Sequence, residues 1–577
     1  MHPLDKPRSA GFPNRHSRLT PFLLSLLWLT GCQSPPIHLT PAQEKLAADL
    51  RWIDPHQDPL PSLTPVIDIH AHTFNARYLP LEGILLGKRD AAPPISSLIT
   101  DHCARLTARA LIDQTELSAI PGHEGIPRVD GTQELRRQGR PGPVCRILLG
   151  LVDKAIREGA WDPSKSVMEQ MAIVDDMAAT KMTVLERMAA RAAARMMGMG
   201  DHVMAGRETA ETVSGIQAAV RFLWLLTQND AAMVENYRAM HAGPPMLGKL
   251  TVVSHMMDLG PVYNQCPDGR SLLDFESQQV RRMEHFQAQP DSGLIYFVAY
   301  NPYRDFLTNC PPTDSLDLVR RAILEHGARG VKIYPPSGYR PAGNDIRPRP
   351  VGLFEKQPKR QWDARYARLG NNPNHTLDQQ LERLLEWCIA QDVPVFVHCG
   401  HQEFEARRGY GAHHADSLFW QQFLESHSTP GQPCTLRLCL GHAGGDEFWH
   451  DSRQNAYSEW GRRVYELCTR YPNVYCEITT DVAMTREEGR AILVERLARL
   501  FDESARASQA PELTGVRHPF SQKLMYGTDW YLPDQGRPAA VLLGTQKAFL
   551  HERLRAHYAD YFSANARRYL KLGSITK

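Results

Sequence analysis

The sequence predicts an α/β fold, a parallel (β/α)8 TIM barrel with a large helical insertion after its first strand. Short apolar runs rich in β-branched residues alternate with helix-like stretches, and several of these runs lead into a histidine or an aspartate. Alternation of this kind favours a parallel sheet, and eight strands favour a sheet closed as a barrel. The runs are residues 66–69, 249–254, 293–300, 330–334, 393–398, 436–440, 473–478 and 523–527.

The composition is that of an ordinary globular protein. Of 577 residues, 42% are hydrophobic and 23% are charged, which is ample for a sizeable buried core. Lysine and arginine number 66 against 64 aspartate and glutamate, so no polycationic surface is indicated. We therefore expect no nucleic-acid partner, and the oligomeric state is left open.

The N-terminus has the layout of a signal peptide, because four basic residues precede an apolar run at 21–29. That run is about half the ~20 residues needed to span a bilayer as a helix. Residues 29–32, Leu-Thr-Gly-Cys, resemble the bacterial lipobox. The resemblance implies a signal peptide at 1–31, a lipid on Cys32 and a membrane-anchored lipoprotein, expected at the periplasmic face of the outer membrane. Plain secretion and a chance apolar stretch are the alternatives.

The rest of the chain divides into a tether and a barrel. Residues 32–64 are polar and rich in proline, as expected for a tether, and the folded barrel is expected over 65–577. The gap between the first two strands is far longer than an ordinary connection. Residues 166–199 and 208–240 within it carry apolar residues at helical spacing, so we expect a helical insertion at about 75–248.

The first strand ends in His70 and His72, whose alternate spacing places both imidazoles on one face. Imidazole suits zinc and similar ions, and barrel enzymes keep their sites at the C-terminal ends of strands. Three other runs lead into His398, His442 and Asp529. Together these positions predict a metal site.

The same segments resemble the amidohydrolase superfamily, in the branch that includes aminocarboxymuconate semialdehyde decarboxylase. The resemblance runs from about residue 65 to 570, apart from the insertion. It is carried by DIHAHTF at 68–74, FVAYNPYRD at 297–305, GVKIYPPSGYRP at 330–341, VPVFVHCG at 393–400, LGHAGG at 440–445, NVYCEIT at 473–479 and LMYGTDW at 524–530.

The resemblance implies a role for each matching residue. His70, His72 and His398 would be ligands of one divalent metal, expected to be zinc. Asp529 would touch the metal and accept the proton of a bound water, whose pKa a metal can lower toward ~7. His442 would contact the reacting carbonyl or the water and act as a general acid or base.

Further residues are candidates for binding a substrate. Arg304 and Arg340 follow the third and fourth strand runs, and arginine matches carboxylate geometry, so a small anionic molecule is expected. Tyr334 and Trp530 are candidate pocket walls. In some superfamily members a carboxylated lysine bridges two metals, but a structural or substrate-facing Lys332 is the preferred interpretation here.

The favoured function is metal-dependent hydrolysis of an ester, lactone or amide by metal-activated water. Non-oxidative decarboxylation by the same ligands is the alternative reaction. A catalytically inactive barrel that serves as a surface binding module is the alternative of another class, and the retained ligand residues argue against it.

Cys266 and Cys310 follow the second and third strand runs at similar short distances. Loops after adjacent parallel strands lie close enough for a disulfide, which an oxidising compartment would permit. We therefore predict a bond between them, with two free thiols as the alternative.

Overall fold

The computed structural model describes most of the barrel and parts of the segments around it. The described ranges are 39–55, 65–82, 101–115, 145–147, 149–150, 224–241, 250–260, 279–290, 292–306, 314–344, 373–401, 411–450, 457–479, 486–530 and 538–573, with single residues at 84, 154, 173, 176, 177, 181, 183 and 484.

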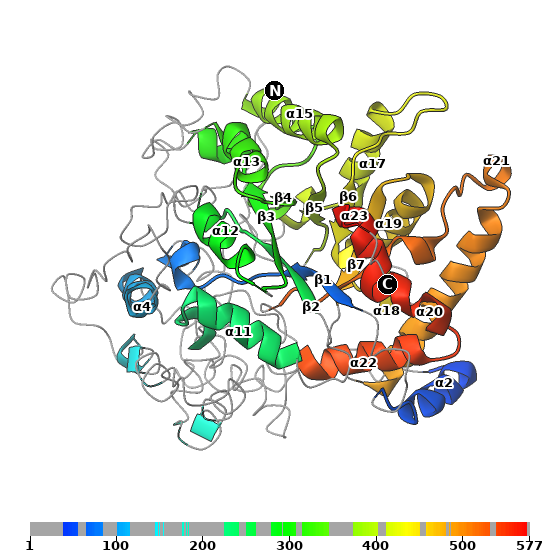
Figure 1. Ribbon diagram of the computed structural model, residues 1–577, viewed down its shortest axis with the longest axis horizontal. Helices are drawn as coiled ribbons and strands as arrows, with labels where there is room; N and C mark the ends of the chain where they lie inside the picture. Colours follow the sequence, from blue (N-terminus) through cyan, green and yellow to red (C-terminus); the bar gives the residue numbers. More distant parts are fainter. Residues whose placement is uncertain are drawn as a thin grey trace, which may run out of the picture.

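Eight strands form one parallel sheet in the order β1 to β8, and the predicted (β/α)8 barrel is confirmed (Figure 1). The sheet is nearly closed, because Ala71 forms a parallel bridge with Trp530 and the amide of Asp529 donates to the carbonyl of His70 at 2.7 Å. Each predicted run overlaps one strand. The strands are β1 (Val66–Ala71), β2 (Leu250–His255), β3 (Leu294–Tyr300), β4 (Gly330–Ile333), β5 (Val395–His398), β6 (Leu438–Gly441), β7 (Val474–Thr479) and β8 (Leu524–Gly527).

Helices pack around the strands (Figure 1). Helix α13 (Ser315–Leu324) shows why they form: Asp314 caps its first turn by accepting hydrogen bonds from the amides of Leu316 and Asp317, and its apolar face is buried. The longer helices after β2 are α12 (Arg281–Gln287), α13 (Ser315–Leu324), α15 (Pro373–Gln391), α17 (Ser417–Ser426), α19 (Ser458–Arg470), α20 (Glu487–Ala507), α22 (Pro538–Leu550) and α23 (Asn565–Leu570), with short helices α16 (Gly411–His414), α18 (Glu447–His450) and α21 (Pro511–Thr514).

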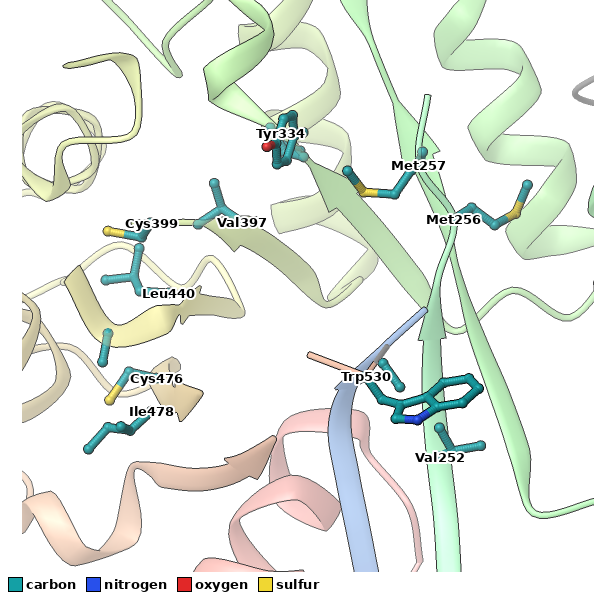
Figure 2. Close-up of a cluster of buried hydrophobic side chains, with 14 of the residues drawn as sticks. Val252, Met256, Met257, Tyr334, Val397, Cys399, Leu440, Cys476, Ile478 and Trp530 are labelled. Atoms are coloured by element: carbon teal, nitrogen blue, oxygen red, sulfur yellow. The ribbon is translucent and has the colours of Figure 1, made fainter. Parts of the chain in front are cut away.

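The apolar core has two parts. A small cluster, which includes Ile67, Phe297 and Phe396, collects residues from β1, β3 and β5 together with Tyr569 of α23. A larger cluster lies between the strands and the helices, and Figure 2 shows part of it, with Trp530 next to Val252. The first cluster therefore fills the barrel, and the second attaches the helices to it.

Strand β1 contains an irregularity that matters for the site. Its pairing with β2 passes from Asp68 opposite Val252 to Ala71 opposite Ser254, so β1 carries one more residue than its partner over this step. A bulge of this kind redirects side chains. It allows the His70 ring to lie 4.5 Å from the ring of Phe396, in the barrel.

Part of the expected tether is folded. Helix α2 (Pro41–Arg51) begins with a capping box between Thr40 and Gln43, and it buries Leu46, Ala47 and Leu50. Its Arg51 forms an ion pair with Glu487 of α20 at 2.7 Å. The expected start of the folded part at residue 65 was therefore too late, because a capping box at Thr40-Pro41-Ala42-Gln43 begins a helix with an apolar face.

The described part of the expected insertion includes the helices α4 (Asp101–Gln114) and α11 (Asp230–His241). Most of residues 75–248, the predicted signal peptide, Cys32 and the predicted Cys266–Cys310 pair lie outside the described residues. Among the helices in the described ranges, none combines the length and apolar character needed to cross a membrane.

Candidate metal centre

His70 and His72 meet Asp529 where β1 and β8 adjoin. The Nε2 atoms of the two histidines lie 3.2 Å and 3.1 Å from the same carboxylate oxygen, Oδ1 of Asp529. All three side chains are buried, and one donor atom from each lies within 4.8 Å of the others. The structure therefore brings these three predicted site residues together.

The opposite nitrogen of each imidazole is held by a hydrogen bond. Nδ1 of His70 lies 2.7 Å from Oε1 of Glu477, and Nδ1 of His72 lies 2.9 Å from the carbonyl of His255. The carbonyl of His255 can only accept, so Nδ1 of His72 is the donor in that hydrogen bond, and the Nε2 atoms of both rings face Asp529. Metal-ligating histidines are oriented in this way by carboxylates and carbonyls.

His442 and His398 extend the cluster across the barrel. The ring centroid of His442 lies 5.0 Å from that of His70 and 4.4 Å from that of His398. His398 is thus placed one ring beyond the trio formed by His70, His72 and Asp529, and its role as a ligand stays a prediction. Its Nε2 is buried and has no hydrogen-bond partner among the described residues.

The backbone is strained at two of these positions. His442 has φ of 61° and Asp529 has φ of 49°, in the left-handed region that side chains other than glycine rarely adopt. Conformations of this kind cost on the order of 1–3 kcal/mol and are common at functional sites. Their presence at both candidate acid–base residues is consistent with a site held in a fixed geometry.

Burial sets the charge states of the cluster. It lowers the pKa of His70 and of His398 well below the usual range and lowers the pKa of His442 to about 4. Burial opposes ionisation of Asp529, but the hydrogen bond with His72 and the nearby His442 and Lys332 lower its pKa overall. Neutral imidazoles and an ionised carboxylate are the forms that bind metals.

These donors fit a divalent ion. Imidazole nitrogens with one carboxylate oxygen form a set that zinc and similar metals accept, and the buried Nε2 of His398 is a further donor nearby. The absence of a side chain at Gly527 leaves space for Glu477 and His70 behind these donors. A Cβ there would lie 3.0 Å from Oε2 of Glu477 and 3.1 Å from Cβ of His70.

Lys332 of β4 faces the same cluster. Its Nζ lies 3.2 Å from Nε2 of His70 and 4.4 Å from the ring centre of Phe396, and the residue is buried. It is therefore placed at the donors themselves. Carboxylation of Lys332 with a second metal was the less favoured alternative, and it stays untested.

Two further residues of the cluster escaped the sequence analysis. Glu477 of β7 accepts hydrogen bonds from Nδ1 of His70 and from the amide of His442, the latter at 3.0 Å. His255, at the end of β2, lies with its Nε2 2.7 Å from the carbonyl of Ile69. Two features of the sequence could have indicated them. Glu477 is an acidic residue inside an apolar strand, and His255 is a further histidine at the end of a strand.

The predicted substrate-binding arginines differ in their surroundings. The guanidinium of Arg304 forms two hydrogen bonds with the carboxylate of Asp258, one of them at 2.7 Å, so its charge is neutralised within the protein. Arg340 is only 9% exposed and lies over the ring of Phe419 at 4.2 Å. Its Nε is buried, and no described group accepts a hydrogen bond from it.

The two predicted aromatic walls have different neighbours. The ring of Tyr334 lies 4.9 Å from that of His398, and the indole of Trp530 contacts Tyr237 of α11 edge to face at 5.3 Å. Figure 2 shows Tyr334 and Trp530 well separated, directly after β4 and after β8. Tyr334 therefore borders the histidines, whereas the Trp530 ring packs against the inserted segment.

Residues 298–572 match the family described as amidohydrolase. This region extends from β3 to α23 and contains His398, His442 and Asp529, whereas His70 and His72 precede it. Among solved structures, a protein of Lactobacillus casei ATCC 334 that is provisionally described as a metal-dependent hydrolase is 12% identical, with a TM-score of 0.35 over 89% of this chain and 96% of the other. That likeness is too weak to carry an argument. No curated protein matches the chain.

Proposed function

We propose that the protein is a metal-dependent hydrolase of the amidohydrolase type, which cleaves an ester, lactone or amide bond in a small anionic molecule. The observation that carries the proposal is the convergence of two imidazole Nε2 atoms on one carboxylate oxygen, with both Nδ1 atoms fixed by hydrogen bonds. The family match over residues 298–572 supports it independently.

A divalent ion would be held by His70, His72 and Asp529, with His398 as a further donor. When bound, it would supply Lewis acidity, which lowers the pKa of water and polarises a carbonyl. Asp529, ionised in its buried position, would accept a proton. His442 has a pKa of about 4, so it is neutral at pH 7 and can exchange a proton with the reacting group.

We propose that the substrate is anionic because of the surroundings of Arg340. A buried guanidinium is costly unless an anion accompanies it, and no described carboxylate does so here. Arg304 contributes less to this proposal because Asp258 already pairs with it.

Decarboxylation of an aromatic acid would use the same donors. The two reactions differ in their products, so release of carbon dioxide from aromatic acids, with esters and lactones unchanged, would replace the hydrolase proposal. A binding module without activity would show no turnover of any of these compounds.

The test compares Asp529→Asn with the unaltered protein after both are loaded with zinc and screened against esters, lactones and amides. We expect the variant to lose about 10²- to 10⁴-fold in rate, as for removal of a general acid or base. Asp392→Asn is a matched control, because Asp392 also has a positive φ of 51° but pairs with Arg437 in the turn before β5. Absence of a bound divalent ion in the purified protein, or full activity of Asp529→Asn, would contradict the proposal.

A further inference from the structure

The carboxylate of Asp68 joins three parts of the chain that are distant in sequence. Its Oδ1 accepts hydrogen bonds from the amides of His70 at 3.0 Å and Thr528 at 3.1 Å. Its Oδ2 accepts from the hydroxyl of Thr528 at 2.5 Å and from the hydroxyl of Tyr237 at 2.7 Å. These four donors occupy the lone pairs of both oxygens, and Asp68 is fully buried.

This network lies where the barrel closes. Asp68 precedes the bulge in β1 that brings His70 into the barrel, and Thr528 directly precedes Asp529. The amide of Asp529 in turn donates to the carbonyl of His70 at 2.7 Å. The relative position of His70 and Asp529 is thus set by the hydrogen bonds that Asp68 accepts from both segments.

The fourth donor, Tyr237, comes from the inserted segment. Its helix α11 is fixed to the barrel by a buried ion pair between Asp230 and Arg282 of α12, and Asp230 also accepts a hydrogen bond from Tyr78 at 3.3 Å. The Tyr237 ring is fully buried and contacts Trp530 edge to face. The hydroxyl of Tyr237 is therefore held in place by its own helix.

We infer that Tyr237 is a positioning residue of the metal centre, acting through Asp68 on His70 and Asp529. The inserted segment would then be a required part of the centre. This inference rests on the metal centre of the proposed function.

The physical reason is the cost of leaving a buried carboxylate short of donors. Without the Tyr237 hydroxyl, Oδ2 of Asp68 would lack one hydrogen-bond donor. The Asp68 carboxylate would then rotate toward another donor, or a water molecule would enter to replace the hydroxyl. Either change would move the amides of His70 and Thr528, which Asp68 holds. Metal ligands must lie within about 0.2 Å of their ideal distances, and loss of a partner behind the ligands costs about 10- to 100-fold in affinity.

Tyr237→Phe tests the inference because it removes the hydroxyl and keeps the ring against Trp530. We expect the dissociation constant for Zn²⁺, measured by competition with a chromophoric chelator, to rise about 10- to 100-fold. Tyr296→Phe is the matched control, since its buried hydroxyl donates to the carbonyl of His326 at 2.6 Å, away from the seam. Its dissociation constant should stay within about 2-fold of the unaltered protein. Equal effects of the two substitutions would overturn the inference.

A second pair of variants tests the route. Asp68→Asn should itself weaken Zn²⁺ binding, and adding Tyr237→Phe to it should cause little further loss, because coupled residues are not additive. Independent losses that multiply would show that Tyr237 does not act through Asp68. The visible spectrum of bound Co²⁺ should change in both single variants and not in Tyr296→Phe. If the unaltered protein bound no Zn²⁺, the metal centre itself would be refuted; equal binding by all variants would refute the inference alone.

Discussion

Arg340 combines deep burial with a positive charge that no described carboxylate neutralises. Its backbone is fixed on both sides, since the side chain of Asn344 accepts from its amide at 3.0 Å and donates to its carbonyl at 2.8 Å. The ring of Phe419 lies against the guanidinium at 4.2 Å. We propose that this fixed side chain binds a planar anion at the C-terminal end of the barrel.

Replacement of Arg340 should affect substrate binding more than the chemical step. For Arg340→Gln we expect KM for a carboxylate-bearing substrate to rise about 10- to 100-fold, from the loss of about 1.5–3 kcal/mol of charged hydrogen bonding, with kcat nearly unchanged. A neutral analogue of the same substrate should show no such change. Arg321→Gln, at an exposed ion pair with Asp317, is the control. An equal rise in KM for both substrates would refute the anion role.

At the level of residues, the sequence predicted the candidate metal ligands at the ends of strands. It did not predict the side chains that orient these ligands. His70, His72 and Asp529 follow apolar runs, and position alone indicated their proximity. Glu477 meets His70 across 407 residues of chain. No local pattern shows that contact, because it depends on which side chains of β1 and β7 point into the barrel at the same height.

Among the elements, α2 gives a direct test of where the folded part begins. Leu50 is fully buried, while Trp52, two residues later, is 83% exposed. Leu50→Ala should lower the free energy of unfolding by about 2–5 kcal/mol, through lost burial and the cavity that remains. Trp52→Ala should change it by no more than about 0.5 kcal/mol. Urea denaturation measures both, and a negligible effect of Leu50→Ala would mean that α2 is not packed on α20 in solution.

The strands were predictable as elements because buried parallel strands are nearly continuous apolar runs. The bulge in β1 was not, since the alternation of His70 and His72 reads as a regular strand. Only the pairing with β2 shows the extra residue between Asp68 and Ala71. Helix α2 was not predicted because residues 32–64 are polar and rich in proline, although a capping box begins the helix at Thr40.

At the scale of the whole molecule, the order of strands followed from the alternation of runs and helices. The seam between β1 and β8 closes the barrel from the two ends of the folded chain. Its contacts join residues about 460 positions apart, such as Asp68 and Thr528. The way in which the inserted segment meets this seam could not be predicted, because helical periodicity in α11 does not identify Asp68 as the partner of Tyr237.

A metal bound at this seam should stabilise the whole barrel. His70 and His72 come from β1, and Asp529 follows β8, so an ion that binds all three holds together segments that separate on unfolding. The unfolded chain offers no such preformed site. Zn²⁺ at about 100 times its dissociation constant should therefore add about 2.7 kcal/mol to the free energy of unfolding.

Denaturant unfolding of the protein with Zn²⁺, and after treatment with a chelator, measures this difference. His72→Ala should remove most of it, because the variant loses one donor of the trio. His557→Ala is the control, since His557 contacts Phe501 edge to face at 4.8 Å, away from the seam. A stabilisation by Zn²⁺ that His72→Ala retained in full would place the ion elsewhere on the molecule, and the metal centre at the β1–β8 seam would have to be abandoned.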